Sequence, residues 1–120
     1  MEKEILNCKE KYSKRALLII NPVSGKKLVI RYIPDIIRRL MDSGYLVTTA
    51  VTSRRGEATD IAAQLGAEYD LVCCTGGDGT LNEVISGLAS SDTEVALGYI
   101  PCGSTNDFAA SHGLSIDIPT

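Results

Sequence analysis

The chain has 120 residues, of which 44 % are hydrophobic and 22 % charged, and its formal net charge at pH 7 is -3. This length allows one domain with a modest core, and the composition is ordinary for a globular protein. Because the net charge is slightly negative, the chain has no general attraction for nucleic acid or anionic membranes, and any site for a polyanion must be local. We therefore expect no nucleic-acid partner.

The sequence carries no recognisable membrane or secretion signal. Its apolar runs are far too short to cross a bilayer, and the first residues, "MEKEILNCKEKYSKR", mix both charge signs without an apolar core. The four cysteines (Cys8, Cys73, Cys74 and Cys102) form no Cys-x-x-Cys pair, and one histidine adds little to them as metal ligands. We expect reduced, mostly buried thiols in a cytoplasmic protein, and no metal site.

The first third of the chain predicts a strand, a loop and a helix. Residues 1–14 are polar, and we expect a flexible lead-in. Residues 15–21, "RALLIIN", form an apolar run without alternation, as in a strand buried on both faces. After the loop "NPVSGKK", residues 28–41 repeat apolar positions at helical spacing, and Pro34 is expected to kink this helix or to open its second part.

The rest of the chain repeats this alternation of strand and helix. From β-branched runs and helical periodicity we expect strands over 45–52, 69–75 and 95–101, and helices over 58–65, over 81–88 and from about 104. This order predicts an α/β fold with three layers, in which a parallel Rossmann-like sheet has helices on both faces. Right-handed crossovers would join the strands.

The unusual loops all follow the carboxyl ends of the predicted strands. They are "NPVSG", "TSRRGEA", "TGGDGT" and "PCGSTND", whereas the opposite connections, "DSGY", "GAEY" and "SSDTE", are plain turns. Ligands of open parallel sheets bind at the carboxyl edge. We therefore expect the four loops to converge on one crevice.

The loop "TGGDGT" at 75–80 fits a phosphate or nucleotide site. Its glycines allow the backbone to approach an anion, and the N-terminus of the next helix offers free N–H groups. Two common phosphate motifs are absent: Lys27 stands where a P-loop needs Ser or Thr, and Asn82 stands at the third glycine of a dinucleotide fingerprint.

A structural alternative exists for part of this pattern. Thr80 to Glu83 and Ser104 to Asp107 each have the form of a capping box, in which the first and last side chains satisfy the start of a helix. Capping does not explain why Gly76, Gly77 and Asp78 occur together. Four cations, Lys26, Lys27, Arg54 and Arg55, would add positive potential around the crevice or form a solvated face.

Together, the loops resemble the diacylglycerol kinase catalytic domain, a superfamily that includes bacterial lipid kinases and sphingosine kinases. The resemblance covers about residues 16–118 and rests on four motifs in the family's order: "NPVSG" at 21–25, T-x-x-x-G-x-A at 52–58, "TGGDGTLNEVISGL" at 75–88 and "IPCGSTNDFA" at 100–109. It implies the fold of the N-terminal domain of NAD kinases and diacylglycerol kinases. It also implies transfer of the γ-phosphate of ATP, with Mg2+, to the hydroxyl of a diacylglycerol-like lipid.

The same resemblance implies a set of site residues. The nucleotide site would comprise Asn21, Pro22, Ser24, Gly25, Thr52, Gly76, Gly77, Asp78, Gly79, Thr80, Leu81, Asn82, Glu83, Gly103, Ser104, Asn106 and Asp107. Asp78 is the candidate catalytic residue, acting near metal or substrate, and the alternative is that it bonds backbone N–H groups of its own turn. Ser104 replaces the family's usual Thr, and Ala110 replaces its usual Arg.

Kinases of this family have a second domain, a β-sandwich that carries the acceptor-lipid surface, the magnesium ligands and the usual general base. The chain is therefore expected to be the nucleotide-binding α/β domain alone, over residues 15–120, with little kinase activity by itself. Peripheral contact with the inner face of a membrane is implied for the intact enzyme, and pairing of two copies through an exposed sheet edge is a further option. The alternatives are a kinase for NAD or a sugar phosphate, which "PCGSTND" disfavours, and a non-catalytic nucleotide-binding regulatory domain.

Overall fold

The computed structural model describes residues 7–22 and 28–101. Its helices are α1 (Cys8–Lys11), α2 (Leu28–Asp42), α3 (Glu57–Leu65), the 3-10 helix η1 (Gly66–Glu68) and α4 (Asp78–Ser90). Its strands are β1 (Lys14–Ile20), β2 (Tyr45–Val51), β3 (Leu71–Gly76) and β4 (Ala96–Pro101). The helix expected from about residue 104 lies outside the described residues.

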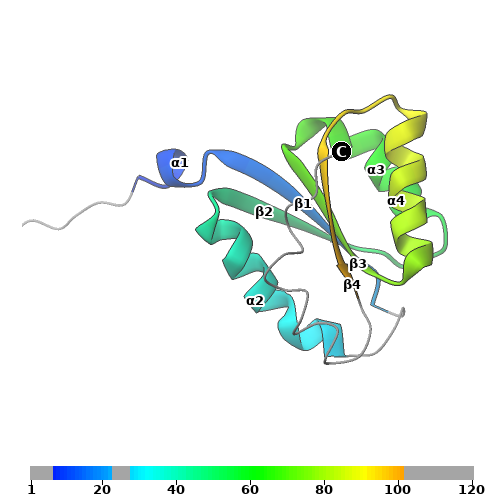
Figure 1. Cartoon of the computed structure of the whole chain (residues 1–120), viewed down its shortest axis with the longest axis horizontal. Helices are drawn as coiled ribbons and strands as arrows, with labels where there is room; N and C mark the ends of the chain where they lie inside the picture. The colour runs from blue at the N-terminus through cyan, green and yellow to red at the C-terminus, as the bar shows by residue number, and fades with distance from the viewer. Residues whose placement is uncertain (1–6, 23–27, 102–120) are drawn as a thin grey trace, which may run out of the picture.

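The four strands form one parallel sheet in the order β2-β1-β3-β4. Helix α2 lies on one face of the sheet, and α3 and α4 lie on the other (Figure 1). The predicted three-layer α/β fold is therefore confirmed. In the sheet, β2 lies on one side of β1 and β3 lies on its other side. The direction in which successive strands are added therefore reverses at β1. A reversal of this kind is where open α/β sheets leave a crevice for ligands.

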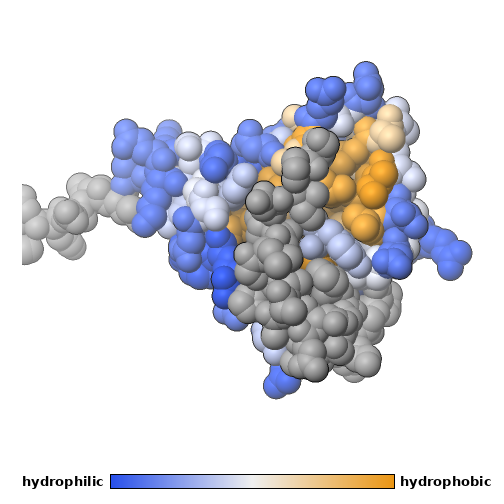
Figure 2. Space-filling model, viewed as in Figure 1, coloured by the Kyte–Doolittle hydropathy of each residue, from blue (hydrophilic) through white to orange (hydrophobic). Residues whose placement is uncertain are grey.

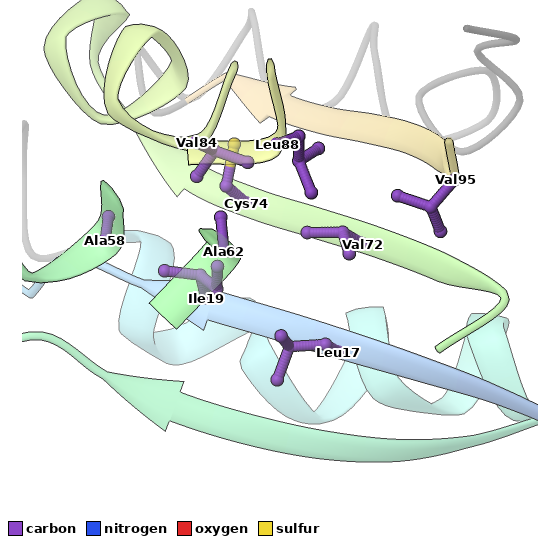
Figure 3. Close-up of a cluster of buried hydrophobic side chains, with 9 residues drawn as sticks. All are labelled: Leu17, Ile19, Ala58, Ala62, Val72, Cys74, Val84, Leu88 and Val95. Atoms are coloured by element: carbon purple, nitrogen blue, oxygen red, sulfur yellow. The ribbon is translucent and has the colours of Figure 1, made fainter. Parts of the chain in front are cut away.

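Each face of the sheet has its own core. On the face of α2, Ile36 and Leu40 pack against Leu18 and Cys73 of the central strands. On the other face, side chains from β1 and β3 meet α3 and α4 (Figure 3); this second cluster comprises Leu17, Ile19, Ala58, Ala62, Val72, Cys74, Val84, Leu88 and Val95. Both faces of β1 and β3 are thus covered, which explains why their sequences are apolar without alternation.

Two of the cysteines lie in these cores. Cys73 and Cys74 are adjacent on β3 and point to opposite faces of the sheet, and neither is exposed. Burial raises the pKa of each thiol to about 12, so both remain neutral and unreactive at physiological pH. Cys8 is exposed.

Several boundaries differ from those predicted by the sequence. A short helix, α1, forms before β1 because the Asn7 side chain accepts a hydrogen bond from the N–H of Glu10 at 3.2 Å. Helix α2 continues through Pro34. The η1 turn delays β3 to Leu71, and α4 begins at Asp78, directly after β3. Within the described residues, no helix combines the length and apolar character that a membrane crossing requires.

The outer surface of the α3 and α4 layer is partly apolar. Apolar surface is visible over α4 and β4 in Figure 2, and Ile85 of α4 is 45 % exposed. This layer therefore leaves some apolar side chains uncovered.

Helices α3 and α4 are in close contact at one glycine. A Cβ atom placed on Gly87 would lie 2.9 Å from the Cβ of Ala62 and 3.0 Å from the backbone N of Ala63, and it would overlap the carbonyl oxygen of Thr59. Real Cβ atoms essentially never come this close to such neighbours. Only glycine therefore allows α4 to lie against the backbone of α3.

We predict that Gly87→Ala destabilises the fold, because the new methyl group would force the two helices apart. The expected loss is about 1–3 kcal/mol of unfolding free energy, the usual cost of overpacking, measured by urea denaturation. Gly79→Ala is the matched control, since nothing lies within 4 Å of a Cβ at that position. An equal loss in both variants would contradict the account of the α3–α4 contact.

Candidate functional site

A cleft lies at the carboxyl edge of the sheet. It has a volume of about 520 Å³, and the described residues that line it are Asn21, Thr52, Ser53, Arg54, Arg55, Ala58, Gly77, Gly79, Thr80 and Glu83. They come from the loops that follow β1, β2 and β3 and from the first turns of α3 and α4. Three of the four predicted loops therefore converge, and the loop after β4 lies outside the described residues.

The turn from β3 into α4 is built on glycines. Gly76 has a φ of 138°, a backbone angle that residues with a side chain rarely adopt. Its carbonyl oxygen accepts a hydrogen bond from the Tyr99 hydroxyl at 3.0 Å. Gly77 is the N-cap residue of α4, without a side-chain cap. The first N–H groups of a helix have no partner inside it. The amides of Asp78 and Gly79 are thus oriented as in an anion-binding helix N-terminus.

Thr80 connects this turn to the end of β1. The Asn21 side-chain amide donates a hydrogen bond to the Thr80 hydroxyl at 3.0 Å, and Thr80 is only 5 % exposed. The predicted capping role of Thr80 is therefore wrong, because the strand leads so directly into the helix that Gly77 takes the N-cap position. Thr80 instead holds the loop after β1 close to the turn between β3 and α4.

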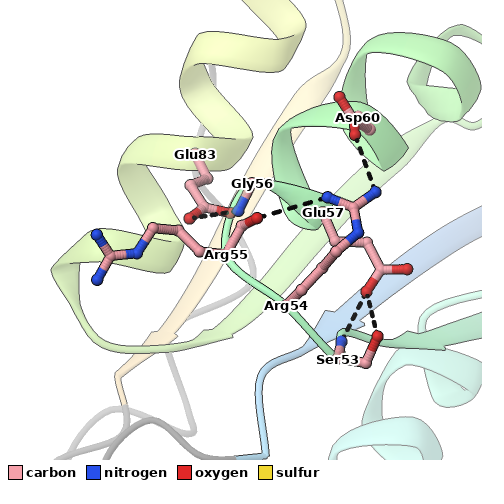
Figure 4. Close-up of polar contacts among 7 residues, drawn as sticks. All are labelled: Ser53, Arg54, Arg55, Gly56, Glu57, Asp60 and Glu83. Carbon is pink, nitrogen blue, oxygen red and sulfur yellow. Dashed lines mark hydrogen bonds and ion pairs between the residues drawn. The ribbon is translucent and has the colours of Figure 1, made fainter.

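Glu83 connects α4 to the loop after β2. Its carboxylate accepts a hydrogen bond from the N–H of Gly56 at 3.2 Å (Figure 4). Its carbonyl oxygen accepts a second one from the Thr59 hydroxyl at 3.0 Å. Gly56 has a φ of 89°, so the turn needs glycine at this point. The predicted role of Glu83 as the second half of a capping box is wrong, because its side chain holds a residue 27 positions earlier in the sequence.

The loop between Thr52 and α3 is held by a second carboxylate. The Glu57 carboxylate accepts hydrogen bonds from the N–H and the hydroxyl of Ser53, at 2.6 and 3.1 Å. The backbone hydrogen bond from Ser53 is the main cause that lowers the pKa of Glu57. This contact therefore persists above the ordinary pKa of a glutamate and is lost as the pH falls through the lowered value.

Two adjacent arginines of this loop have different surroundings. Arg54 forms an ion pair with Asp60 at 3.4 Å and donates a hydrogen bond to the carbonyl oxygen of Arg55. The guanidinium of Arg55 has no partner among the described residues, and it extends past Glu83 in Figure 4. Because Arg55 lines the cleft, its charge is available to an anion placed there.

Asp78, the candidate catalytic residue, is exposed and is the first residue of α4. No hydrogen bond joins its side chain to another described residue, so the bond to its own turn that we considered is not formed there. A carboxylate in the first turn of a helix is favourable with respect to the helix dipole. The helix dipole is therefore sufficient to explain an acidic residue at position 78, independently of any role in a reaction.

The other predicted site residues are distributed unevenly. Pro22 lines an apolar groove on the α2 face instead of the cleft, Leu81 packs against the second core cluster, and Asn82 is exposed outside the cleft. Ser24, Gly25, Gly103, Ser104, Asn106 and Asp107 lie outside the described residues. Ser53 and Ala58 line the cleft without having been predicted; their position in an unusual loop after a strand was the available signal.

The described residues offer no obvious metal site. Nowhere in residues 7–22 and 28–101 do three His, Cys, Asp or Glu side chains gather as metal ligands would. Asp78 and Glu83 therefore cannot hold a divalent cation together with a third such side chain from this part of the chain.

Comparison with known proteins places the chain in a family. Residues 15–120 match the profile of the diacylglycerol kinase catalytic domain. The chain belongs to this family. It is 41 % identical over 102 residues to a diacylglycerol kinase of Bacillus subtilis, and 45 % identical over 106 residues to one of Staphylococcus epidermidis. These alignments cover 84 % and 88 % of the chain, and 34 % of each relative.

A solved structure agrees with this membership. The crystal structure of a diacylglycerol kinase from Bacillus anthracis superposes with a TM-score of 0.68 and 31 % identity, over 84 % of this chain and 37 % of that one. The family resemblance predicted from the four motifs is thus confirmed. The chain spans about a third of the length of the diacylglycerol kinases that it matches.

We predict that Glu83→Ala releases the turn at Gly56. A hydrogen bond to a charged group contributes about 1.5 kcal/mol or more, so the exchange rate of the Gly56 amide should rise at least about tenfold in hydrogen-exchange NMR. Glu83→Gln keeps an acceptor oxygen and should have a smaller effect. Glu57→Ala is the matched control and should expose the amide of Ser53 instead. An unchanged Gly56 amide in Glu83→Ala would show that the carboxylate does not hold this turn.

Proposed function

We propose that this chain is the ATP-binding part of a lipid kinase, which transfers the γ-phosphate of ATP to the hydroxyl of a diacylglycerol-like lipid. The observation that carries the proposal is a single cleft lined both by the N-terminus of α4 and by Arg55, whose guanidinium has no partner among the described residues. Membership of the diacylglycerol kinase family supports the reaction class. The names of the relatives support the lipid acceptor.

The cleft fits a nucleotide in size and in chemistry. Its volume of about 520 Å³ lies within the range of about 300–1,000 Å³ that is usual for ligand pockets. Free amides at a helix N-terminus and an arginine are the groups that proteins use to bind phosphate oxygens. We assign the phosphates to the side of Gly77 and Gly79, and the remainder of the nucleotide to the side of Asn21 and Thr52.

Phosphoryl transfer depends on positioning and on neutralising charge. In this proposal the chain positions ATP, and magnesium, which neutralises phosphate charge, is bound with ligands from elsewhere in the intact enzyme. The lipid acceptor and a general base would likewise come from the part of the relatives that this chain does not match. Peripheral contact with the inner face of a membrane would deliver the lipid. The 120-residue chain alone would therefore bind nucleotide and have little kinase activity, and Asp78 would act only in the intact enzyme.

Arg54 and Arg55, in the loop after β2, allow a test of the phosphate assignment. Arg55→Gln should weaken ATP binding by roughly tenfold, equivalent to 1.4 kcal/mol, because it removes from the cleft a cation that has no partner among the described residues. Arg54→Gln is the matched control and should change the affinity much less, since Arg54 is already paired with Asp60. Isothermal titration with ATP measures both, and adenosine, which lacks phosphates, should bind equally to all variants.

Two outcomes would overturn the proposal. If the wild-type chain binds neither ATP nor ADP, with or without magnesium, the cleft is not a nucleotide site. If Arg54→Gln weakens ATP binding as much as Arg55→Gln, the effect reflects the general charge of the loop and the phosphates are not placed beside Arg55.

A further inference from the structure

One tyrosine of β4 contacts the glycine-rich turn from the side away from the cleft. The register of β4 with β3 pairs Tyr99 with Cys74, two residues before Gly76, and the Tyr99 hydroxyl donates a hydrogen bond to the carbonyl oxygen of Gly76 at 3.0 Å. The cleft lies on the other side of β3, because its lining comes from the ends of β1, β2 and β3. Tyr99 is not among the described residues that line it. It therefore acts on the turn without facing the cleft.

Packing determines where the Tyr99 hydroxyl lies. The half-buried ring packs against the second core cluster, and a tyrosine side chain has only two torsion angles. The hydroxyl at its end is therefore held at one place. Gly76 is buried, and a buried carbonyl oxygen needs hydrogen-bond partners. Tyr99 supplies one of them from 23 positions later in the sequence.

The peptide that Tyr99 holds joins two glycines. A peptide flips when the ψ of its first residue and the φ of its second change together, and glycine tolerates φ of either sign. Beyond this peptide, Gly77 is held by α4, since its carbonyl oxygen accepts hydrogen bonds from the N–H groups of Thr80 and Leu81 at 3.1 and 3.3 Å. The Gly76–Gly77 peptide precedes these bonds. Its orientation therefore depends on contacts outside the helix, such as the one with Tyr99.

The orientation of this peptide matters for an anion in the cleft. In a trans peptide the C=O and N–H bonds point in opposite directions. With the carbonyl oxygen of Gly76 turned toward β4, the N–H of Gly77 is directed to the side of the cleft. A flip would reverse both groups and direct the carbonyl oxygen to that side. Its partial negative charge would then repel a phosphate beside the amides of Asp78 and Gly79.

We infer that Tyr99 is a positioning residue for phosphate binding. Its hydroxyl holds the Gly76–Gly77 peptide with the carbonyl oxygen turned away from the cleft, so the turn has its anion-binding shape before a ligand arrives. A site that is organised in advance binds more tightly, because less conformational entropy is lost on binding. The inference rests on the proposed function, since it takes the phosphates to lie beside Gly77 and Gly79.

Removal of one hydroxyl group tests the inference. Tyr99→Phe keeps the ring in the core and removes the donor to Gly76. It should weaken the binding of ATP and of inorganic triphosphate by about three- to tenfold, the range that corresponds to one hydrogen bond. Adenosine, which has no phosphates, should bind as tightly as to the wild-type chain. Isothermal titration of the 120-residue chain measures all three affinities.

Tyr69→Phe is the matched control. The Tyr69 ring is also half-buried and packs against the second core cluster, and its hydroxyl forms no hydrogen bond with another residue in the part of the chain that the structure describes. This variant should change none of the three affinities. Circular dichroism establishes that both variants are folded.

A second measurement needs no ligand. In Tyr99→Phe the Gly76–Gly77 peptide should exchange between two orientations, because its carbonyl oxygen has lost the tyrosine donor. NMR relaxation dispersion detects exchange on the microsecond-to-millisecond timescale and should show it at the Gly77 amide. The wild-type chain and Tyr69→Phe should show no such exchange there.

Any of three results overturns the inference. They are an unchanged ATP affinity in Tyr99→Phe, an equal loss of affinity for ATP and for adenosine, and a Gly77 amide whose chemical shift and relaxation in this variant match those of the wild-type chain. The second result would mean that the hydroxyl supports the whole cleft and not its phosphate side. A wild-type chain that binds no ATP overturns the proposed function instead, and the Gly77 amide then still decides whether Tyr99 holds the peptide.

Discussion

The close contact of α3 with α4 at Gly87 determines the geometry on which the candidate site depends. Because residue 87 has no side chain, α4 lies directly against the backbone of α3 near Thr59 and Ala62. This places Glu83, one turn earlier on α4, beside the turn at Gly56, where its carboxylate accepts the backbone N–H. The loop after β2 is thereby fixed next to the glycine-rich turn after β3, although these segments are not adjacent in the sheet. The cleft is the space that this arrangement leaves between them.

The same geometry accounts for acidic residues next to a predicted phosphate site. Glu83 is directed to Gly56 and holds protein structure, while Asp78 occupies the first position of a helix, where a carboxylate is favourable. Among the described residues, the groups left for an anion are the amides of the first turn of α4 and the guanidinium of Arg55. Neutral backbone and one cation can bind a polyphosphate locally even though the chain as a whole has a net charge of -3.

The sequence predicted the order of strands and helices because buried parallel strands and amphipathic helices have different apolar patterns. It also predicted that the unusual loops would meet, since all of them follow strand ends. The roles of Thr80 and Glu83 could not be predicted in the same way. Their spacing matches a local capping box, but their partners, Asn21 and Gly56, are distant in the sequence and become neighbours only when the sheet order and the α3–α4 contact are established. Pro22 was assigned to the nucleotide site, whereas the chain turns it toward the α2 face.

The central claim is that the cleft at the carboxyl edge binds ATP through the first turn of α4 and the loop after β2. The most direct measurement is amide chemical-shift mapping of the 120-residue chain during titration with ATP and magnesium. The account predicts that the largest shifts occur at Gly77, Gly79, Thr80 and residues 52–56, with little change at Ile33 and Ile37 on the opposite face of the sheet. Saturable binding that shifts only the α2 face, or no binding at all, would contradict it.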